Sequence, residues 1–461
     1  MRKGLTSLTD TKKKEELFER TPVPQAVAQL AIPTVIACLV MVIYNLADTF
    51  FVGILDDTLE TNAVTLAAPV LLAFNAVTNL FGTGCSSMMS RALGQKDYET
   101  VRKSAAFGIY GAVICGLLFS FCATVFRTTL LHLLGASAEN CDRTADYLFW
   151  TVTCGAVPSM LNVVMGNLVR AEGSALHASI GTMSGCLLNI ILDPLMILPW
   201  GLGWGAAGAG LATFISNCVA CGYFAVYLFV KRKETFISIK PSDFLPSKLV
   251  CFEIFAVGIP ASIQNLLNVT GMTIMNNFMS GYDTDAISAM GITHKVAMVP
   301  MYVSMGISQG ILPLIGYNYA ARNSKRMKET VRFTEKIAGA FMVLAAIAFF
   351  SFSEPIIGIF MKNEQVVFYG GAFLKGASLA MPFLFFDFLA VGIFQACGMG
   401  KHSLVFAILR KVVLEIPAMF ALNAIVPMYG LAYAQLVAEF VLSIAAFIIL
   451  EKILRTEYTV K

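Results

Sequence analysis

The sequence predicts an all-α integral membrane protein with twelve transmembrane helices in two parallel six-helix bundles. Hydrophobic residues make up 57% of the 461 residues and charged residues only 13%, with a mean hydropathy of +0.73. Soluble domains are about one quarter charged. Apolar runs long enough to cross a bilayer recur along the whole chain, and motifs of its first half return in the second.

The apolar runs predict one transmembrane helix each, because a span requires about 20 predominantly apolar residues. They are continuous rather than alternating, so strands of a membrane barrel are not expected. The predicted spans are 27–54, 62–90, 104–126, 146–169, 175–200, 205–230, 249–280, 286–316, 337–361, 366–396, 403–427 and 429–450.

The positions of Lys and Arg predict that both termini are cytoplasmic, since cytoplasmic loops are enriched in these residues. With that orientation, only Arg127, Arg143 and Lys362 fall in loops on the other side. The net charge of +4 then reflects membrane orientation, and no basic face for nucleic acid is expected. The predicted organisation is a cytoplasmic arm (1–26), a first lobe of six spans (27–230), a cytoplasmic linker (231–248), a second lobe of six spans (249–450) and a cytoplasmic tail (451–461).

The two halves repeat one another. Ile32-Pro33 opens the first span and Ile259-Pro260 opens the seventh, while the sequence ETVR follows the second span at 99–102 and the eighth at 329–332. Six spans per half mean that both halves enter from the same side, so the repeats are parallel. Two such halves side by side enclose a central cleft that can open to either face, which is typical of a transporter.

Acidic residues inside spans are candidates for function, because burying a charge in a bilayer is costly. Asp48 in the first span and Asp193 in the fifth lie at similar depth, and Asn45 and Asn189 lie about one helical turn from them. Two carboxylates and two amides suit a proton or a sodium ion. The alternative is helix–helix hydrogen bonding without transport chemistry.

The second half offers weaker candidates. Asp387 is open to either a transport or a structural role, whereas Glu415 has Lys411 one turn before it, which favours a structural ion pair. Glu439 has no evident partner. In the seventh span, amide and Met side chains suit the lining of a cavity for varied ligands, or else hydrogen bonding between helices; these are Gln264, Asn268, Met272 and Asn276.

Signatures of enzymes and cofactors are missing from the sequence. It has no nucleotide-binding Gly-rich loop and no HExxH or GxSxG motif, and its four His are not spaced as metal ligands. The 11 Cys are interpreted as structural thiols. We therefore expect neither an enzyme nor a cofactor, and no metal beyond a coupling Na⁺ at Asp48, Asn189 and Asp193.

Several segments resemble the multidrug and toxic compound extrusion (MATE) family, in particular its bacterial branch of DNA-damage-inducible-type efflux proteins. They are IPTVIACLVMVIYNLADTFFVG, SRALGQKD, the stretch from VRAEG to NIILDP, GAAGAGLATFIS, GIPASIQNLLN and QGILPLIGYNYAARNSKRM. The resemblance covers residues 27–450. It implies a V-shaped molecule that exports small cationic, amphipathic compounds in exchange for H⁺ or Na⁺, as a monomer in the plasma or inner membrane.

The resemblance also implies roles for individual residues. Asp48, Asn189 and Asp193 match a cation-binding or proton-binding cluster that Thr213 completes, and Pro33 matches a proline at which the first helix bends. Asn268 stands where other members carry an acid, while Asp387 matches an acid of the tenth helix. An alternative within the same superfamily is a flippase for lipid-linked sugars, whose basic cavity would need residues such as Lys295 or Arg410.

Overall fold

The computed structural model describes residues 14–55, 57–137 and 139–456, and within these ranges the chain is helical with no strand. The first 13 residues of the predicted arm and residues 457–461 of the predicted tail lie outside the described ranges. The α-helices are α2 (Val23–Ile54), α3 (Thr58–Gly94), α4 (Tyr98–Val125), α5 (Arg127–Leu133), α6 (Cys141–Leu148), α7 (Ala156–Ala171), α8 (Ala175–Ile197), α9 (Gly205–Val230), α10 (Lys248–Met279), α11 (Thr284–Ala320), α12 (Ser324–Ser351), α13 (Ser353–Phe360), α14 (Glu364–Ala396), α15 (Gly400–Ile408), α16 (Ile416–Ile425) and α17 (Ala434–Thr456). Two π-helical segments, η1 (Phe149–Cys154) and η3 (Leu409–Glu415), and two 3₁₀ turns, η2 (Pro241–Asp243) and η4 (Tyr429–Tyr433), complete the elements.

Short polar side chains fix where several long helices begin. Asp57 accepts a hydrogen bond from the backbone N–H of Leu59 at the start of α3, and Asp97 accepts one from Thr100 at the start of α4. Asn323 caps α12 in the same way. Such caps satisfy N–H groups that have no partner within the helix, so the polar residues between the apolar runs define the helix ends.

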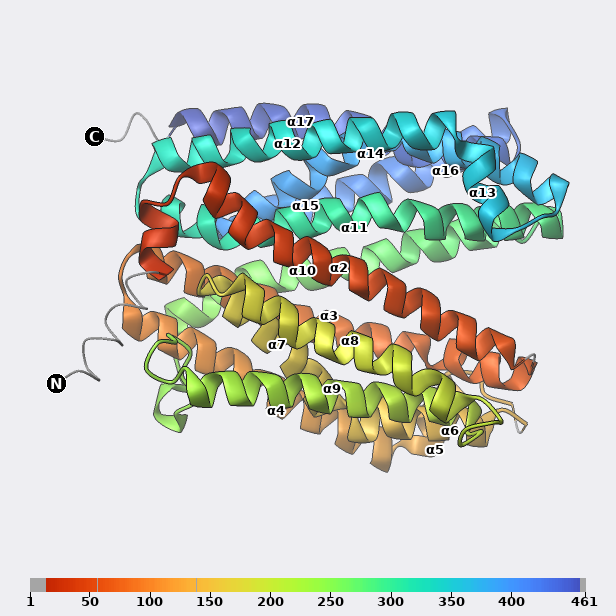
Figure 1. Cartoon of the computed structure of the whole chain (residues 1–461), viewed down its shortest axis with the longest axis horizontal. Helices are drawn as coiled ribbons and strands as arrows, with labels where there is room; N and C mark the ends of the chain where they lie inside the picture. Colours follow the sequence, from red (N-terminus) through yellow and green to blue (C-terminus); the bar gives the residue numbers. More distant parts are fainter. Residues whose placement is uncertain (1–13, 56, 138, 457–461) are drawn as a thin grey trace.

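The helices form two bundles. The first bundle contains α3 to α9 and the second contains α10 to α17. In Figure 1 the first bundle lies below the second. Helix α2 runs diagonally between them and packs against α11 of the second bundle and α8 of the first (Figure 1). We call the end of the molecule where the described chain begins and ends the proximal end, and the opposite one the distal end.

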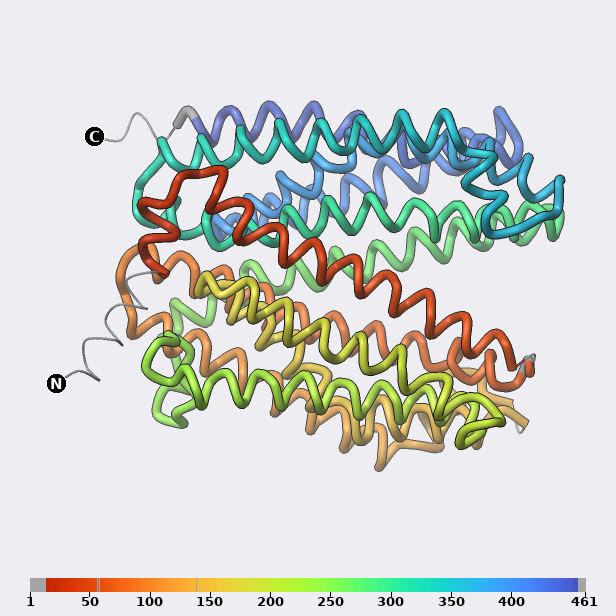
Figure 2. The backbone as a smooth tube through the Cα atoms, viewed as in Figure 1, coloured from red at the N-terminus to blue at the C-terminus, as the bar shows by residue number. Residues whose placement is uncertain are grey.

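The bundles touch at the proximal end and diverge toward the distal end, as the backbone trace in Figure 2 shows. Small residues permit the proximal contact. A Cβ atom added at Gly84 of α3 would lie 2.5 Å from the carbonyl oxygen of Ile254 in α10, and one at Gly258 of α10 would lie 2.2 Å from that of Leu80 in α3. The backbones of α3 and α10 therefore touch directly over this stretch.

Nine of the helices in the described ranges are long and apolar enough to cross a membrane. The segments 141–154 and 156–171, bent by 51° at their break, form a tenth span if they are counted as one. The last two predicted spans correspond to residues 400–425 and to α17, which carry buried charges such as Arg410 and Glu439. The all-helical membrane fold is confirmed, and the count of twelve spans stays a prediction.

Candidate functional site

The distal half of helix α8 in the first bundle holds a buried acid with an amide beside it. Asn189 and Asp193 lie one turn apart on α8, and both are almost completely buried. In the amide orientation that satisfies its neighbours, Asn189 donates to the two carboxylate oxygens of Asp193 at 2.9 and 3.2 Å, and it accepts from the backbone N–H of Thr213 on α9 at 3.0 Å. The structure thus brings together Asn189, Asp193 and Thr213 from two helices.

Asp48 of α2 lies beside this group. Helix α2 packs on α8, and the carboxylates of Asp48 and Asp193 are close enough for their charges to interact. Asp48 is partly exposed, and it forms no hydrogen bond with another described side chain. Asn45, one turn before Asp48, is also partly exposed. One acid of the pair is therefore sealed in the bundle, while the other reaches its surface.

Two tyrosines complete this cluster, and the sequence reasoning missed both. Tyr44 of α2 and Tyr147 of α6 each lie close enough to Asp48 and to Asp193 to interact with their charges. For Tyr44 a signal was available, since it precedes Asp48 by one helical turn. Tyr147 offered none, because it lies on α6, which packs on α3 and α9, and only the fold brings its side chain near the two acids.

Among the residues that the structure describes, no basic side chain forms an ion pair with Asp48 or Asp193. Both acids lie in buried surroundings, and the charged neighbour of Asp193 within the described chain is the other acid, Asp48. A buried carboxylate without a positive partner is costly. Such a pair binds a cation or takes up a proton, because either one removes the uncompensated charge.

Pro33 lies in the proximal half of α2, and the helix continues across it. Its ring nitrogen cannot donate the hydrogen bond that would reach the carbonyl of Gln29. Thr34, next to it, donates its hydroxyl to the carbonyl of Leu30 at 2.8 Å. Helix α2 therefore lacks one backbone hydrogen bond at this point.

The second bundle contains a different kind of charge cluster, in which acids are paired with bases. Arg410 lies between Asp387 of α14, at 3.2 Å, and Glu439 of α17, at 2.8 Å. Next to it, Lys411 pairs with Glu415 at 2.7 Å, as their spacing predicted. Arg410, Lys411 and Glu415 all belong to the π-helical segment η3, and such segments often occur at functional sites.

The polar residues of the seventh predicted span lie on α10 in several environments. Gln264 accepts a hydrogen bond from Gln395 of α14 at 3.3 Å and is partly exposed, as is Asn268. Met272 and Asn276, nearer the distal end, are exposed. A role of these side chains in lining a substrate cavity stays a prediction, whereas Asp387 is 1% exposed and held by Arg410.

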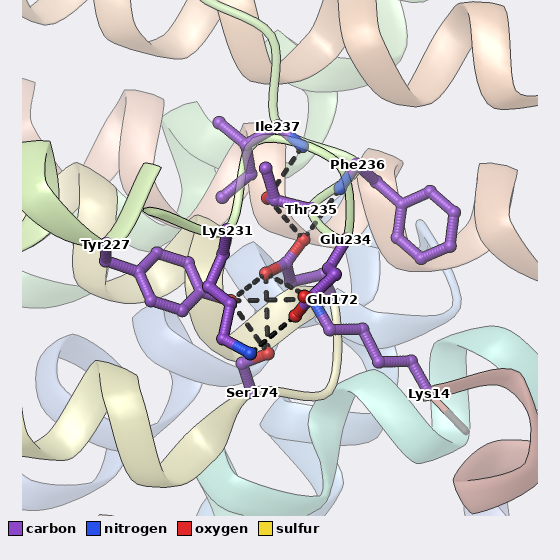
Figure 3. Close-up of polar contacts among 9 residues, drawn as sticks. All are labelled: Lys14, Glu172, Ser174, Tyr227, Lys231, Glu234, Thr235, Phe236 and Ile237. Carbon is purple, nitrogen blue, oxygen red and sulfur yellow. Dashed lines mark hydrogen bonds and ion pairs between the residues drawn. The ribbon is translucent and has the colours of Figure 1, made fainter. Parts of the chain in front are cut away.

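A further buried acid, Glu172, lies in the turn between α7 and α8 at the proximal end, and the sequence reasoning did not single it out. Its carboxylate is 0% exposed and accepts hydrogen bonds from Tyr227, Thr235 and the backbone N–H of Phe236 (Figure 3). Lys14 forms an ion pair with it at 2.8 Å. This one side chain joins the end of α9, the chain segment after α9 and the segment before α2.

Comparison with known proteins gives consistent relatives. A family model described as MatE matches residues 33–195 and again residues 260–421. The multidrug export protein MepA of Staphylococcus aureus strain MRSA252 is 33% identical over 444 residues, which cover 96% of this chain and 96% of MepA. MepA of Staphylococcus saprophyticus is 32% identical over 445 residues, with the same coverage.

Solved structures share the fold. The outward-facing conformation of a multidrug resistance MATE family transporter of the MOP superfamily aligns with a TM-score of 0.90 at 24% identity, covering 96% of this chain and 98% of that one. A mutant of the Vibrio cholerae MATE transporter VcmN aligns with a TM-score of 0.86 at 21% identity, covering 97% and 98%. At these identities the likeness bears on the fold alone.

Proposed function

Because this chain belongs to the MatE family of multidrug and toxic compound extrusion transporters, we propose that it exports cationic, amphipathic organic compounds in exchange for H⁺ or Na⁺. Multidrug efflux itself follows from the family and from relatives that are multidrug export proteins and match this chain along nearly their whole length. The coupling ion and the charge of the substrate are the parts that we add.

The observation that carries the proposal is the pair Asp48 and Asp193. The two acids lie close enough for their charges to interact, and no basic side chain of the described residues pairs with either; Asp193 is buried and Asp48 is partly exposed. A proton or Na⁺ that enters between them removes a buried negative charge. Asn189 and Thr213 supply further polar groups to the same place.

Coupling requires that the ion prefer one conformation over the other. Helix α2 carries Asp48 in its distal half and packs against α11 of the second bundle in its proximal half, where Ala31 and Val35 lie against Gly310 and Gly306. A change in charge at Asp48 therefore acts on a helix that contacts both bundles. Through Pro33, where one backbone hydrogen bond is missing, α2 can bend in response.

We place the proximal end in the cytoplasm of a cell whose plasma or inner membrane holds the protein. Lys and Arg gather at that end, in the loops after α3 and α11 and in the segment after α9, which fits the positive-inside rule. The distal divergence of the bundles then gives an outward-open state, from which substrate leaves. A monomer suffices for this mechanism, because both bundles belong to one chain.

Transport by purified protein in liposomes tests the proposal. A fluorescent organic cation should move against its gradient when a proton or sodium gradient is imposed, and the ion that drives it is the coupling ion. Asp48→Asn should reduce this movement to the level of empty liposomes while the protein remains folded. Asp142→Asn, an exposed acid at the distal end, serves as the control and should transport normally.

Two results would overturn the proposal. Normal gradient-driven efflux by Asp48→Asn would remove the acid pair from the mechanism. Movement that no ion gradient drives, with wild-type protein correctly folded, would exclude antiport.

A further inference from the structure

The segment before α2 lies across the boundary between the two bundles at the proximal end. Residues 14–21, which we call the strap, pass between the turn α7–α8 of the first bundle and the α11–α12 region of the second. Figure 1 shows this segment as a hook at the end where the bundles meet. Its contacts run to both sides.

The second bundle holds the strap mainly through Arg326 of α12. This side chain is 9% exposed, and its guanidinium donates to three backbone carbonyls of the strap, those of Phe18 at 2.6 Å, Leu17 at 3.1 Å and Thr21 at 2.5 Å. Asn318 of α11 also donates to the carbonyl of Phe18, at 3.2 Å. A charged donor with several carbonyl partners makes strong hydrogen bonds, so the path of the strap is fixed on this side.

The first bundle holds the same segment through side chains. Lys14 pairs with the buried carboxylate of Glu172 at 2.8 Å, as Figure 3 shows. Tyr98 of α4 donates to Glu15, and Lys96, in the turn between α3 and α4, pairs with Glu19 at 3.2 Å. These contacts come from two separate places on the first bundle, the turn α7–α8 and the turn α3–α4 with the first residue of α4.

Phe18 is the point at which the two bundles and the strap meet. Its ring is 2% exposed and stacks on Tyr317 of α11 with ring centroids 5.0 Å apart. The ring also lies against Gly173 of the turn α7–α8, where an added Cβ atom would be 3.0 Å from it. Gly173 has a φ of +89°, a conformation suited to glycine, so the turn α7–α8 can approach the ring closely.

We propose that the strap is an interbundle brace that stabilises the conformation closed at the proximal end, and that opening of this end requires the strap to release one bundle. Phe18 cannot remain between Gly173 and Tyr317 when these residues move apart. Likewise the strap, which is eight residues long and is anchored at Glu172 and at Arg326, cannot keep both anchors when the two bundles move apart at this end. The inference rests on the proposed alternation between outward-open and inward-open states.

The direction of the effect follows from population shift. A contact present in one state only favours that state by its own free energy. Removing either anchor therefore raises the fraction of molecules that are open at the proximal end. The two anchors lie on different bundles, so variants at Arg326 and at Lys14 test the same brace independently.

Hydrogen–deuterium exchange of the full-length protein in lipid nanodiscs, without substrate or gradient, measures this population. Arg326→Ala and Lys14→Ala should each raise exchange in the proximal stretches 80–96 and 250–262 by about threefold or more, because these stretches face each other in the closed state. The distal segment 284–296 should exchange more slowly than in wild type, since that end closes. Lys325→Ala, an exposed residue one position before Arg326, is the matched control and should behave as wild type.

The distal segment separates a change of conformation from loss of stability. Faster exchange confined to residues 14–21 in both variants would overturn the proposal, as would faster exchange at both ends of the molecule in the milder variant Lys14→Ala. The exchange pattern requires no transport. If the variants showed this exchange pattern while the wild-type protein moved no cation in liposomes, the brace would be supported and the proposed antiport would be wrong.

Discussion

Arg410 occupies a position in which a single guanidinium serves two acids from two other helices. Asp387 is 1% exposed, Glu439 is 0% exposed and Arg410 itself is nearly buried. Each carboxylate in isolation would carry an uncompensated charge inside the membrane-spanning part of the protein. The three side chains therefore depend on one another, and the cluster ties α14, η3 and α17 together.

Arg410→Met should destabilise the protein by about 3 kcal/mol, because breaking a buried ion pair from one side leaves the remaining charges unpaired. Thermal unfolding of the detergent-solubilised protein measures the loss. The triple variant Arg410→Met, Asp387→Asn, Glu439→Gln removes all three charges and should recover part of it. A single variant as stable as wild type would show that the cluster does not hold the second bundle together.

Local spacing predicted the ion pair of Lys411 with Glu415, but sequence alone did not connect Arg410 to Asp387 and Glu439. The first pair lies within one turn, where side chains four residues apart face each other. The other partners lie on separate helices, and their meeting depends on how α14 and α17 pack around η3. The same reasoning applies to Asp48 and Asp193, for which a shared depth could be predicted but a neighbour such as Tyr147 could not.

At the scale of elements, hydropathy placed the helices well where one helix makes one span. The predicted run 27–54 ends with α2 at Ile54, and the predicted run 205–230 coincides with α9. Hydropathy did not reveal breaks inside a span, as at 146–169, where η1 and a bend of 51° interrupt the helix. Apolarity determines that a segment crosses the membrane, whereas its internal bends arise from packing against neighbours.

The contact between α3 and α10 depends on glycines that bring two backbones together. Gly258→Ala should destabilise the protein by about 1 kcal/mol or more, because the new Cβ atom would meet the carbonyl of Leu80 and force the helices apart. Gly339→Ala in α12 is the matched control, since no atom lies near its Cβ position. This control should be up to about 1 kcal/mol more stable than wild type, as alanine favours a helix.

Thermal unfolding in the same detergent compares the two glycine variants. Helix propensity alone would change the stability of both variants equally, so the prediction concerns the sign of the difference between them. If Gly258→Ala were stabilised as much as Gly339→Ala, the helices would have room to spare, and direct backbone contact would not hold the proximal ends together.

For the molecule as a whole, the closed proximal end combines backbone contact between α3 and α10 with ionic contacts across the bundles. Arg91 of α3 pairs with Glu253 of α10 at 2.8 Å, and Glu19 of the strap accepts a hydrogen bond from Tyr317 at 2.7 Å. Among the described residues, the ionic contacts of the distal end stay within one bundle, as between Arg143 and Asp57 at 2.6 Å. Charge at the proximal end thus holds the two bundles to one another.

Acidification should weaken this hold through Glu19. The hydrogen bond from Tyr317, followed by the contact with Lys96, keeps the pKa of Glu19 below its usual value of 4.5, although burial opposes them. A carboxyl whose folded-state pKa is lowered contributes stability above its unfolded pKa and loses it as the pH falls through the folded value. Glu19→Gln should therefore unfold at a lower temperature than wild type at pH 6, and this gap should close as the pH falls below 4.5. Glu16→Gln, an exposed neighbour, should match wild type throughout; a gap that stayed constant with pH would show that the charge of Glu19 contributes nothing.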